Sequence, residues 1–374
     1  MIHLLKEVGR GKRGARDLTY EEALQAAESI LGLKATPAQI GAFFIAERIK
    51  MESVEELEAF VKVGRKYADR SFVHEGVDCA GPYDGRKSSF FSTLATSFVL
   101  AAADLPVTLH GTASLPPKWG ITLSDILAAK GITGPLLAKE SSIRAARQSG
   151  VLYVHAEDWC PPLKHLRPIR EELGMRTVLN TAEKFVNYSH SPFLTFGVYH
   201  NTVFDRLSRL ITKLGYRKAI IIQGCEGSDE LFIHRPSRTY RVENGEANLQ
   251  IIDPETYGLD TPVPDISWTP SEQANVTEQV LQGKGDIAFV YQVLLNGAVR
   301  LHLADKVRSV EEGIYTCKAL LDSGKPWELY GKWLSLLWNP SRMMVGPRQP
   351  SDMFCIEQKK PAPVSGAGFF LITY

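Results

Sequence analysis

The chain has 374 residues, of which 44% are hydrophobic and 23% are charged, and its formal net charge is +1. This length allows one large domain with a smaller one attached. The near-neutral charge excludes a global electrostatic attraction to nucleic acid or to a membrane, so any such attraction must be local.

The five cysteines lie far apart without a C-x-x-C pair, which favours reduced thiols. The start lacks the features of a signal peptide, and no apolar run approaches the ~20 residues that span a bilayer. We therefore expect a cytoplasmic protein.

The first part of the chain predicts a small helical domain over residues 1–72. "LTYEEALQAAESILG" begins with Thr19 as N-cap and has Glu22 three residues later, the pattern of a capping box. "TPAQIGAFFIAERIK" and "SVEELEAFVKVGRKYADR" begin in the same way with Thr36 and Ser53. The stretch "SFVHEGVD" reads as the linker that follows.

The next part alternates between strands and helices. "VDCAG", "LPVTLHG", "VLYVHA" and "KAIIIQG" predict strands, while "SSFFSTLATSFVLAAAD" and "TLSDILAAKG" predict helices. "TYRVENGEANLQII" is typical of a hairpin with Asn244-Gly245 at its turn. Residues 276–323 return to helix. The pattern predicts an α/β domain over 73–335 with a central, mostly parallel sheet flanked by helices, followed by an irregular Pro- and Gly-rich extension over 336–374.

Two loops of this domain have the residues of a phosphate site. In α/β sheets, ligands bind beyond the carboxyl ends of strands, where helix N-termini offer free N–H groups. The first loop is "GPYDGRKSSFFST" and the second is "LHGTASLPPKWG". Their glycines, hydroxyls and cations suit phosphate oxygens, but the same residues also fit two βα turns with helix-capping serines. The candidate phosphate-binding residues are Gly81, Asp84, Gly85, Arg86, Lys87, Ser92, Thr93, His110, Gly111 and Lys118.

A third loop, "QGCEGSDE", is acidic. Glu226, Asp229 and Glu230 follow an apolar strand. Carboxylate oxygens at a strand end suit Mg²⁺ carried by a phosphorylated substrate, because that ion keeps most of its waters and needs few protein ligands. The alternative is a solvated acidic turn.

Two segments are locally basic. "CPPLKHLRPIREELGMRTVLN" places four cations in one stretch, and an arginine fork there would bind a carboxylate or a phosphate. The alternative is a solvated helix face with internal ion pairs. The N-terminal residues 1–16 have the composition of a flexible basic arm, which either binds a phosphate backbone or stays solvated. The cations concerned are Lys164, Arg167, Arg170, Arg176, Arg10, Lys12, Arg13 and Arg16.

Taken together, these motifs resemble the anthranilate phosphoribosyltransferase family of tryptophan biosynthesis, which shares its fold with the pyrimidine nucleoside phosphorylases. The resemblance runs from about residue 4 to residue 335 and includes "QIGAFFIAERIK", "HGTAS", "LKHLRPIREELGMRTVLN", "IIQGCEGSDE" and "LLDSGK". It implies a helical domain joined by a returning segment at about 160–185, and a homodimer formed through the helical part. It also implies that phosphoribosyl pyrophosphate with Mg²⁺ lies in the cleft and that anthranilate enters between the domains.

The resemblance assigns roles to individual residues. Asp229 and Glu230 match the metal-binding acidic pair, and Ser92-Thr93 match the Ser-Thr that contacts the diphosphate and its metal. His110-Gly111 match the His-Gly of the second loop, and Lys118 matches its lysine. Arg170 matches the arginine assigned to anthranilate.

The donor loops depart from the family pattern. The Gly-Thr-Gly-Gly-Asp-Gly run reads "AGPYDG", in which Pro82 removes an N–H group and Tyr83 fills space that glycine leaves open. Phe90 replaces an asparagine, "HGTASLPP" replaces the second loop's Asn-Arg and serine pair, and "LGPLxNP" becomes "AEKFVNYSHSP". In these departures the chain resembles divergent paralogues of the family, of which a bacterial representative binds nucleic acid through basic residues around its dimer groove.

Two functional hypotheses therefore stay open. The first is a divergent Mg²⁺-dependent phosphoribosyltransferase that acts on phosphoribosyl pyrophosphate or another phosphorylated small molecule, with the acceptor undetermined. The second is a non-catalytic nucleic-acid-binding paralogue whose basic segments form a groove. The retained Asp229-Glu230 pair favours the first, since carboxylates repel phosphates, and the altered donor loop favours the second.

Overall fold

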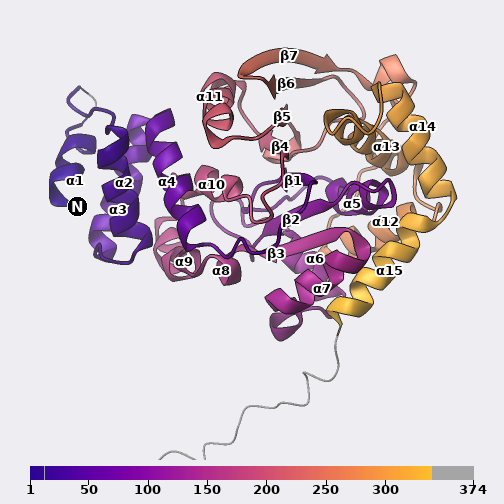
Figure 1. The fold of residues 1–374 in the computed structure, drawn as a ribbon, viewed down its shortest axis with the longest axis horizontal. Helices are drawn as coiled ribbons and strands as arrows, with labels where there is room; N and C mark the ends of the chain where they lie inside the picture. The colour runs from indigo at the N-terminus through magenta and orange to yellow at the C-terminus, as the bar shows by residue number, and fades with distance from the viewer. Residues whose placement is uncertain (12, 339–374) are drawn as a thin grey trace, which may run out of the picture. The chain divides into compact units, whose positions relative to one another are not determined.

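The structure, a computed structural model, describes residues 1–11 and 13–338, so the predicted extension lies almost entirely outside the described part of the chain. A seven-stranded sheet with the order β3-β2-β1-β4-β5-β6-β7 forms its centre (Figure 1). Strands β1 to β5 are parallel, and β6 and β7 are antiparallel. The prediction of an α/β fold with a mostly parallel sheet is confirmed. The strands are β1 (Val77–Ala80), β2 (Val107–Gly111), β3 (Val151–His155), β4 (Phe193–Val198), β5 (Lys218–Gln223), β6 (Ser237–Glu243) and β7 (Glu246–Ile252).

Helices precede the sheet and cover it. The N-terminal helices are α1 (Ile2–Val8), α2 (Tyr20–Leu31), α3 (Pro37–Lys50) and α4 (Val54–Tyr67). The later α-helices are α5 (Ser92–Ala102), α6 (Leu123–Ala129), α7 (Lys139–Ser149), α8 (Ala156–Trp159), α9 (Pro161–Leu173), α10 (Leu179–Ala182), α11 (Phe204–Leu214), α12 (Pro270–Leu281), α13 (Ile287–Leu303), α14 (Val310–Asp322) and α15 (Lys325–Leu337). Short 3-10 turns are η1 (Gly134–Leu137), η2 (Glu183–Phe185), η3 (Asn201–Val203), η4 (Cys225–Gly227) and η5 (Pro254–Tyr257). Among the described residues, no helix combines the length and the apolar character needed to cross a bilayer.

The three predicted N-terminal helices begin where their caps indicate. Thr19, Thr36 and Ser53 each accept a hydrogen bond from the third residue of their helix, and each forms a complete capping box. The prediction of a flexible arm before them was wrong, because residues 2–8 form α1. Leu4 and Val8, one helical turn apart, are buried on this helix, which packs against α3.

A later part of the chain returns to these helices. Helix α9 packs against α2 and α3, and α10 packs against α4. Figure 1 shows α9 and α10 between the helical bundle and the sheet. The Asp69 N–H donates to the Trp159 carbonyl at 2.7 Å, and Arg65 Nε donates to the Phe185 carbonyl at 3.1 Å. The segment expected at about 160–185 therefore links the two parts, while the exact domain boundaries stay a prediction.

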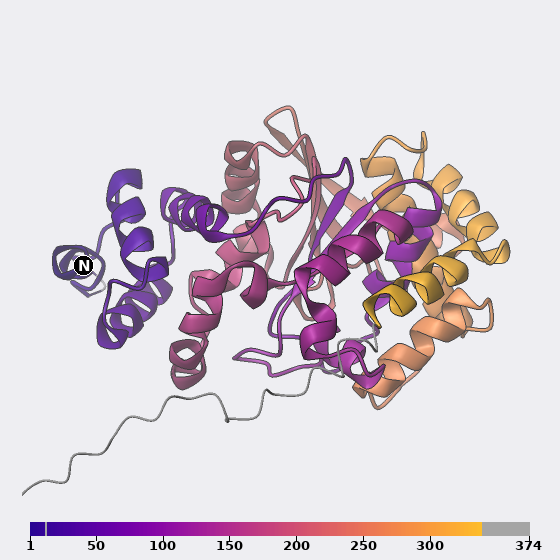
Figure 2. The same ribbon diagram turned by 60° about the horizontal axis from the view of Figure 1, so that its bottom comes forward.

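The sheet separates two apolar layers. On one face, α5 packs against α13 and α15, and every residue of α5 is buried. Figure 2 shows α12 to α15 gathered on this side, in orange and yellow, and the N-terminal helices in indigo on the other. Strand β4, which we did not predict, lies between β1 and β5 with all of its residues buried. At the predicted hairpin turn, Asn244 and Gly245 both have positive φ (54° and 81°), as a type I′ turn requires.

We predict that Phe98→Ala on α5 lowers the free energy of unfolding by about 3–5 kcal/mol, because the ring is fully buried and leaves a cavity. Its ring centroid lies 5.1 Å from that of Tyr330 and 5.4 Å from that of Trp333. Urea unfolding measures the change. Tyr315→Ala, at a side chain that is 77% exposed, is the control and should change the free energy by no more than about 0.5 kcal/mol. Equal effects of the two substitutions would contradict this packing.

Candidate functional site

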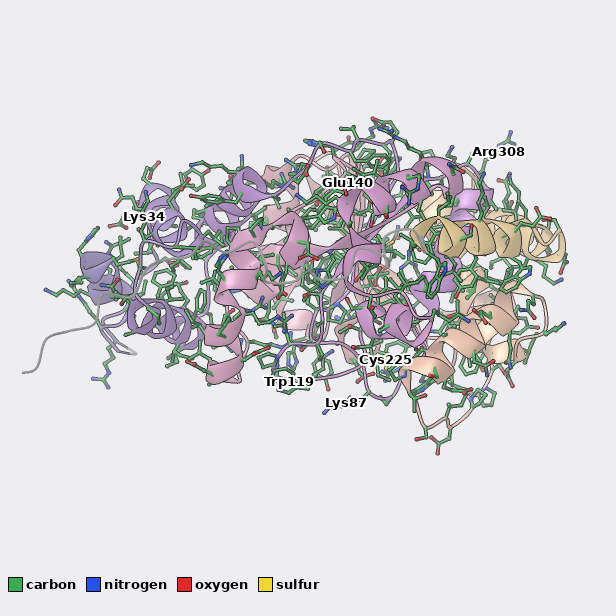
Figure 3. The ribbon with its side chains drawn as sticks, turned by 90° about the horizontal axis from the view of Figure 1, so that it is seen from below. Lys34, Lys87, Trp119, Glu140, Cys225 and Arg308 are labelled. Carbon is green, nitrogen blue, oxygen red and sulfur yellow. The ribbon has the colours of Figure 1, made fainter. Side chains whose placement is uncertain are left out.

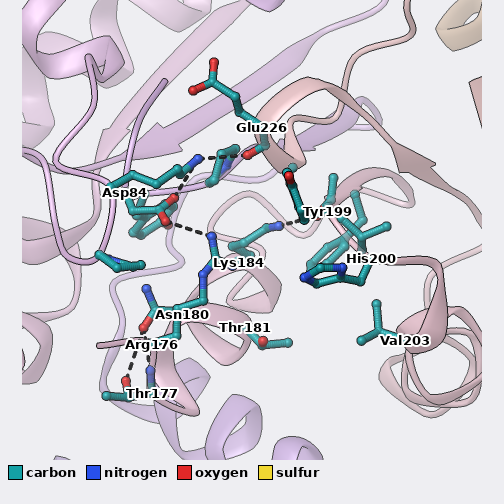
Figure 4. Close-up of a pocket in the computed structure, with 18 of the residues that line it drawn as sticks. Asp84, Arg176, Thr177, Asn180, Thr181, Lys184, Tyr199, His200, Val203 and Glu226 are labelled. Carbon is teal, nitrogen blue, oxygen red and sulfur yellow. Dashed lines mark hydrogen bonds and ion pairs between the residues drawn. The ribbon is translucent and has the colours of Figure 1, made fainter. Parts of the chain in front are cut away.

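A cavity of about 630 Å³ opens beyond the carboxyl ends of β1, β4 and β5 and extends to α3 of the helical bundle (Figure 4). Six basic side chains line it against three acidic ones. This arrangement favours an anionic ligand. The cations are Arg48, Lys87, Lys118, Arg176, Lys184 and Arg206, and the acids are Glu52, Asp84 and Glu226.

The two predicted phosphate loops lie against each other at this cavity. The Arg86 N–H donates to the Ile121 carbonyl at 2.9 Å, and the Ile121 N–H donates to the Arg86 carbonyl at 2.6 Å. Gly85 has a φ of 75°, and a Cβ there would lie 2.3 Å from the Gly120 carbonyl oxygen. Any larger residue would separate the loops, so glycine is required at this position.

Asp84 holds two of the cavity's cations. Its Oδ1 lies 3.1 Å from Lys118 Nζ, and its Oδ2 lies 2.8 Å from Arg176 Nη2. Asp84 itself is buried, and the two cations reach it from the second loop and from the segment after α9 (Figure 4). A phosphate in the cavity would compete with this carboxylate for the same donors.

The first loop's free donors already bind a carboxylate. Glu226 accepts from the Lys87 N–H at 2.8 Å, the Ser88 N–H at 3.1 Å and Ser89 Oγ at 2.9 Å. Burial raises the pKa of the Glu226 carboxyl, but these hydrogen bonds outweigh it and hold the pKa below its ordinary value. The Lys87 side chain makes none of these bonds; it is exposed at the rim of the cavity, at the outer edge of the structure (Figure 3). Glu226 thus occupies the N–H groups that the sequence predicted for phosphate.

The predicted metal ligand Glu230 is paired with an arginine. Arg86 Nη1 and Nη2 lie 2.6 and 2.8 Å from its two carboxylate oxygens, and both residues are buried. The Thr93 N–H and hydroxyl also donate to Glu230 Oε1, at 2.7 and 2.6 Å. Both oxygens of Glu230 therefore have strong donors, and neither is open to a metal ion.

Asp229, the other predicted metal ligand, is paired through one of its two carboxylate oxygens. Arg300 Nη2 lies 2.9 Å from Asp229 Oδ2, which also accepts from Thr195 Oγ1 at 2.9 Å. Ser92 is buried, and its hydroxyl has no hydrogen-bond partner within the described chain. No group of three or more His, Cys, Asp or Glu side chains among the described residues is arranged to hold a metal ion. With the arginines in place, these residues do not fit a metal held by the protein alone.

His110 is held beside the cavity rather than in it. Its Nδ1 lies 2.7 Å from the Tyr83 hydroxyl, and its Nε2 lies 3.1 Å from Asp78 Oδ1. Gly81 and Gly111 lie next to it, around a small void of about 20 Å³, which is room for about one water. Tyr83, one of the departures from the family pattern, thus bonds to the histidine of the second loop.

Arg170, a predicted site residue, does not line the cavity, whereas Lys184 does. Arg170 is buried, and its two Nη atoms lie 2.7 and 2.9 Å from the carboxylate of Glu183, so it does not line the cavity. Lys184, which follows Glu183 in the chain, lines the cavity instead. We did not predict a role for Lys184, although it lies in "AEKFVNYSHSP", one of the stretches that depart from the family pattern.

The family models match the chain in two segments. Residues 2–68 match the helical bundle domain of a glycosyl transferase family, and residues 77–327 match the α/β domain of that family. The chain belongs to this glycosyl transferase family. The resemblance inferred from the sequence motifs is therefore confirmed.

Several similar proteins are anthranilate phosphoribosyltransferases. The anthranilate phosphoribosyltransferase of Acetivibrio thermocellus is 31% identical over 83% of this chain and 90% of its own length. The enzyme of Symbiobacterium thermophilum is 32% identical over 87% of this chain and 94% of its own length. Among solved structures, the Thermus thermophilus enzyme has a TM-score of 0.76 at 23% identity, covering 89% of this chain and 99% of its own. The Saccharomyces cerevisiae enzyme in complex with PRPP and Mg has a TM-score of 0.74 at 19% identity. The match covers 90% of this chain and 97% of the yeast chain.

The basic residues that the nucleic-acid hypothesis requires do not form an unpaired patch in the described part of the chain. Six of the seven that the structure describes are paired with carboxylates, and Lys12 lies outside the described residues. Arg13 is the exception within the described chain. The six are Arg10, Arg16, Lys164, Arg167, Arg170 and Arg176.

We predict that Mg²⁺ alone does not bind the protein, because arginines neutralise Asp229 and Glu230. Calorimetric titration with MgCl₂, without a phosphorylated ligand, should give no saturable heat at millimolar concentration. Adding EDTA should leave the melting temperature unchanged. A one-to-one binding heat that Glu230→Gln abolishes would show that the carboxylate is available to the metal and would contradict the pairing.

Proposed function

We propose that the protein is a phosphoribosyltransferase that binds phosphoribosyl pyrophosphate, or a closely related phosphorylated donor, in the cavity at the carboxyl ends of β1, β4 and β5. The observation that carries this proposal is the excess of basic over acidic side chains on the cavity wall, six against three. The names of the similar proteins support it, since they are anthranilate phosphoribosyltransferases that align over most of this chain.

Lys118 and Arg176 are the side chains that we expect to hold the donor's phosphates. Both already bind the Asp84 carboxylate, at 3.1 and 2.8 Å, so an anion with more charge can take over these donors. Arg48 and Arg206 line the same cavity and add positive charge. In the reaction, the acceptor's nucleophilic atom bonds to the anomeric carbon while the bond to pyrophosphate breaks. The leaving oxygen keeps the electron pair, and these cations stabilise the charge that develops on it.

Mg²⁺ is the cofactor that the family resemblance implies and that the yeast enzyme's complex contains. In this chain Glu230 and Asp229 are committed to arginines, so we expect the ion to arrive bound to the diphosphate rather than to a preformed protein site. When bound, it would supply further charge neutralisation on the leaving group.

The other expectations from the sequence stay predictions. Anthranilate is one candidate acceptor. A homodimer through the helical part is consistent with the exposed side chains of Ile2, Ile49 and Met51. A cytoplasmic location stays an expectation. Among the described residues, most of the basic side chains that the nucleic-acid hypothesis needs are paired with carboxylates.

Calorimetric titration with phosphoribosyl pyrophosphate and Mg²⁺ tests the proposal. We predict saturable binding to the wild-type protein and binding weakened about 10- to 150-fold in Lys118→Ala, because one charge-assisted hydrogen bond contributes about 1.5–3 kcal/mol. Lys306→Ala, at an exposed lysine outside the cavity, is the control and should bind like wild type.

Two results would contradict the proposal. The first is the absence of heat at millimolar ligand, and the second is equal binding by the two lysine variants. Salt-dependent binding of an oligonucleotide in place of the donor would support the nucleic-acid hypothesis instead.

A further inference from the structure

We propose that Lys184 anchors the negative charge of a small carboxylate ligand with an apolar body, and that it makes the binding of this ligand depend on pH. This inference rests on the proposed function in one respect, since it takes the same cavity to be the acceptor's site.

The Lys184 amine faces the cavity without a carboxylate partner. Its hydrogen bond in the structure is to the Gly197 carbonyl at 2.6 Å, and the part of the chain that is described places no acidic oxygen within ion-pair distance of it. Figure 4 shows its side chain in the cavity, between Arg176 and Tyr199. The side chain is only 5% exposed, so its amine is largely removed from water. A buried ammonium without a counter-ion is costly, and an anionic ligand would supply that counter-ion.

The other buried or half-buried cations of the wall differ from Lys184 in this respect. Lys118 and Arg176 share the carboxylate of Asp84. Arg206 contacts the Glu52 carbonyl, and its Nη1 lies 3.6 Å from the Glu52 carboxylate. Arg170, which the resemblance assigns to the acceptor, does not line the cavity, and both of its Nη atoms are bonded to Glu183. Lys184 is thus the desolvated cation of the wall that has no carboxylate partner within ion-pair distance among the described residues; its amine lies instead over the Phe196 ring.

The surface beside Lys184 is apolar. The amine lies 3.8 Å from the centroid of the Phe196 ring. A ligand whose carboxylate reaches Lys184 would lay the rest of its body against apolar side chains and remove them from water. The apolar residues of this wall are Phe196, Val198, Val203 and Leu207, with Tyr199 beside them.

The protonation state of Lys184 changes near neutral pH. Burial lowers the pKa of its amine from the usual value to about 7. Asp229 and Asp84 raise the pKa, whereas Arg176 and Lys118 lower it. Below this pKa the amine carries its charge and attracts an anion, and above it the charge is lost. Carboxylate binding should therefore be strongest on the acid side of neutrality and should weaken as the pH rises.

Fluorescence titration with anthranilate, an aromatic carboxylate that stays ionised across this range, tests the inference. We expect the wild-type Kd to rise about tenfold from pH 6 to pH 8, as the protonated fraction of a group with a pKa near 7 falls. Lys184→Arg should bind with little dependence on pH, because arginine stays charged. Lys184→Met should bind weakly at every pH. The neutral amide 2-aminobenzamide is the matched probe and should bind the three proteins alike at every pH.

Three results would overturn the inference. They are the absence of anthranilate binding to the wild-type protein, a wild-type pH profile that Lys184→Arg retains, and undiminished binding by Lys184→Met at pH 6. Thermal unfolding controls for folding: neither variant should melt below wild type by more than a few degrees, since Lys184→Met removes a buried amine that lacks a carboxylate partner.

A parallel titration with phosphoribosyl pyrophosphate separates this inference from the proposed function. If the donor binds and the anthranilate profile is flat, only the role of Lys184 fails. If the donor does not bind to any of the three proteins, the proposed function fails, whatever the anthranilate result.

Discussion

The buried ion pair between Arg86 and Glu230 is the constraint on which the arrangement of this site depends. It joins the loop after β1 to the loop after β5, residues that lie 144 positions apart in the sequence. Thr93, in the first turn of α5, donates twice to the same carboxylate, so the pair also positions the start of that helix. Removing one partner would leave a buried charge without compensation, which costs about 3–5 kcal/mol.

This pairing divides the charges of the site into two groups. Asp229 and Glu230 are bound to Arg300 and Arg86, and the first loop's N–H groups are bound to Glu226. These groups stabilise the loops. The remaining lining cations face the cavity and give it its positive excess. Phosphate recognition in this chain therefore depends on side chains of the cavity wall more than on a glycine-rich loop, which agrees with the loss of glycines at Pro82 and Tyr83.

The sequence predicted the features that depend on local chemistry. The capping boxes at Thr19, Thr36 and Ser53, the Asn244-Gly245 turn and the meeting of two loops at strand ends all follow from short patterns. Helix α1 was missed because residues 1–16 were interpreted together, and the glycines and most of the cations of that stretch come after Val8. Strand β4 was missed, although all of its residues are buried like those of the predicted strands β1 and β2.

The partners of the site residues could not be predicted, because they are contacts between distant segments. Arg170 and Arg86 looked equally suited to bind an external anion, but each faces a carboxylate within the fold. Lys184 gave no signal except its place in a stretch that departs from the family pattern. What makes it distinctive is burial without a counter-ion, a property of the packed cavity and not of the sequence around it.

A crystal structure of the protein with phosphoribosyl pyrophosphate and Mn²⁺, located by its anomalous signal, tests the central claim most directly. The account predicts the diphosphate between Lys118 and Arg176, the metal on the diphosphate, and the Arg86–Glu230 pair intact. A metal ion bound to Glu230 with Arg86 displaced, or a ligand outside the cavity, would contradict it.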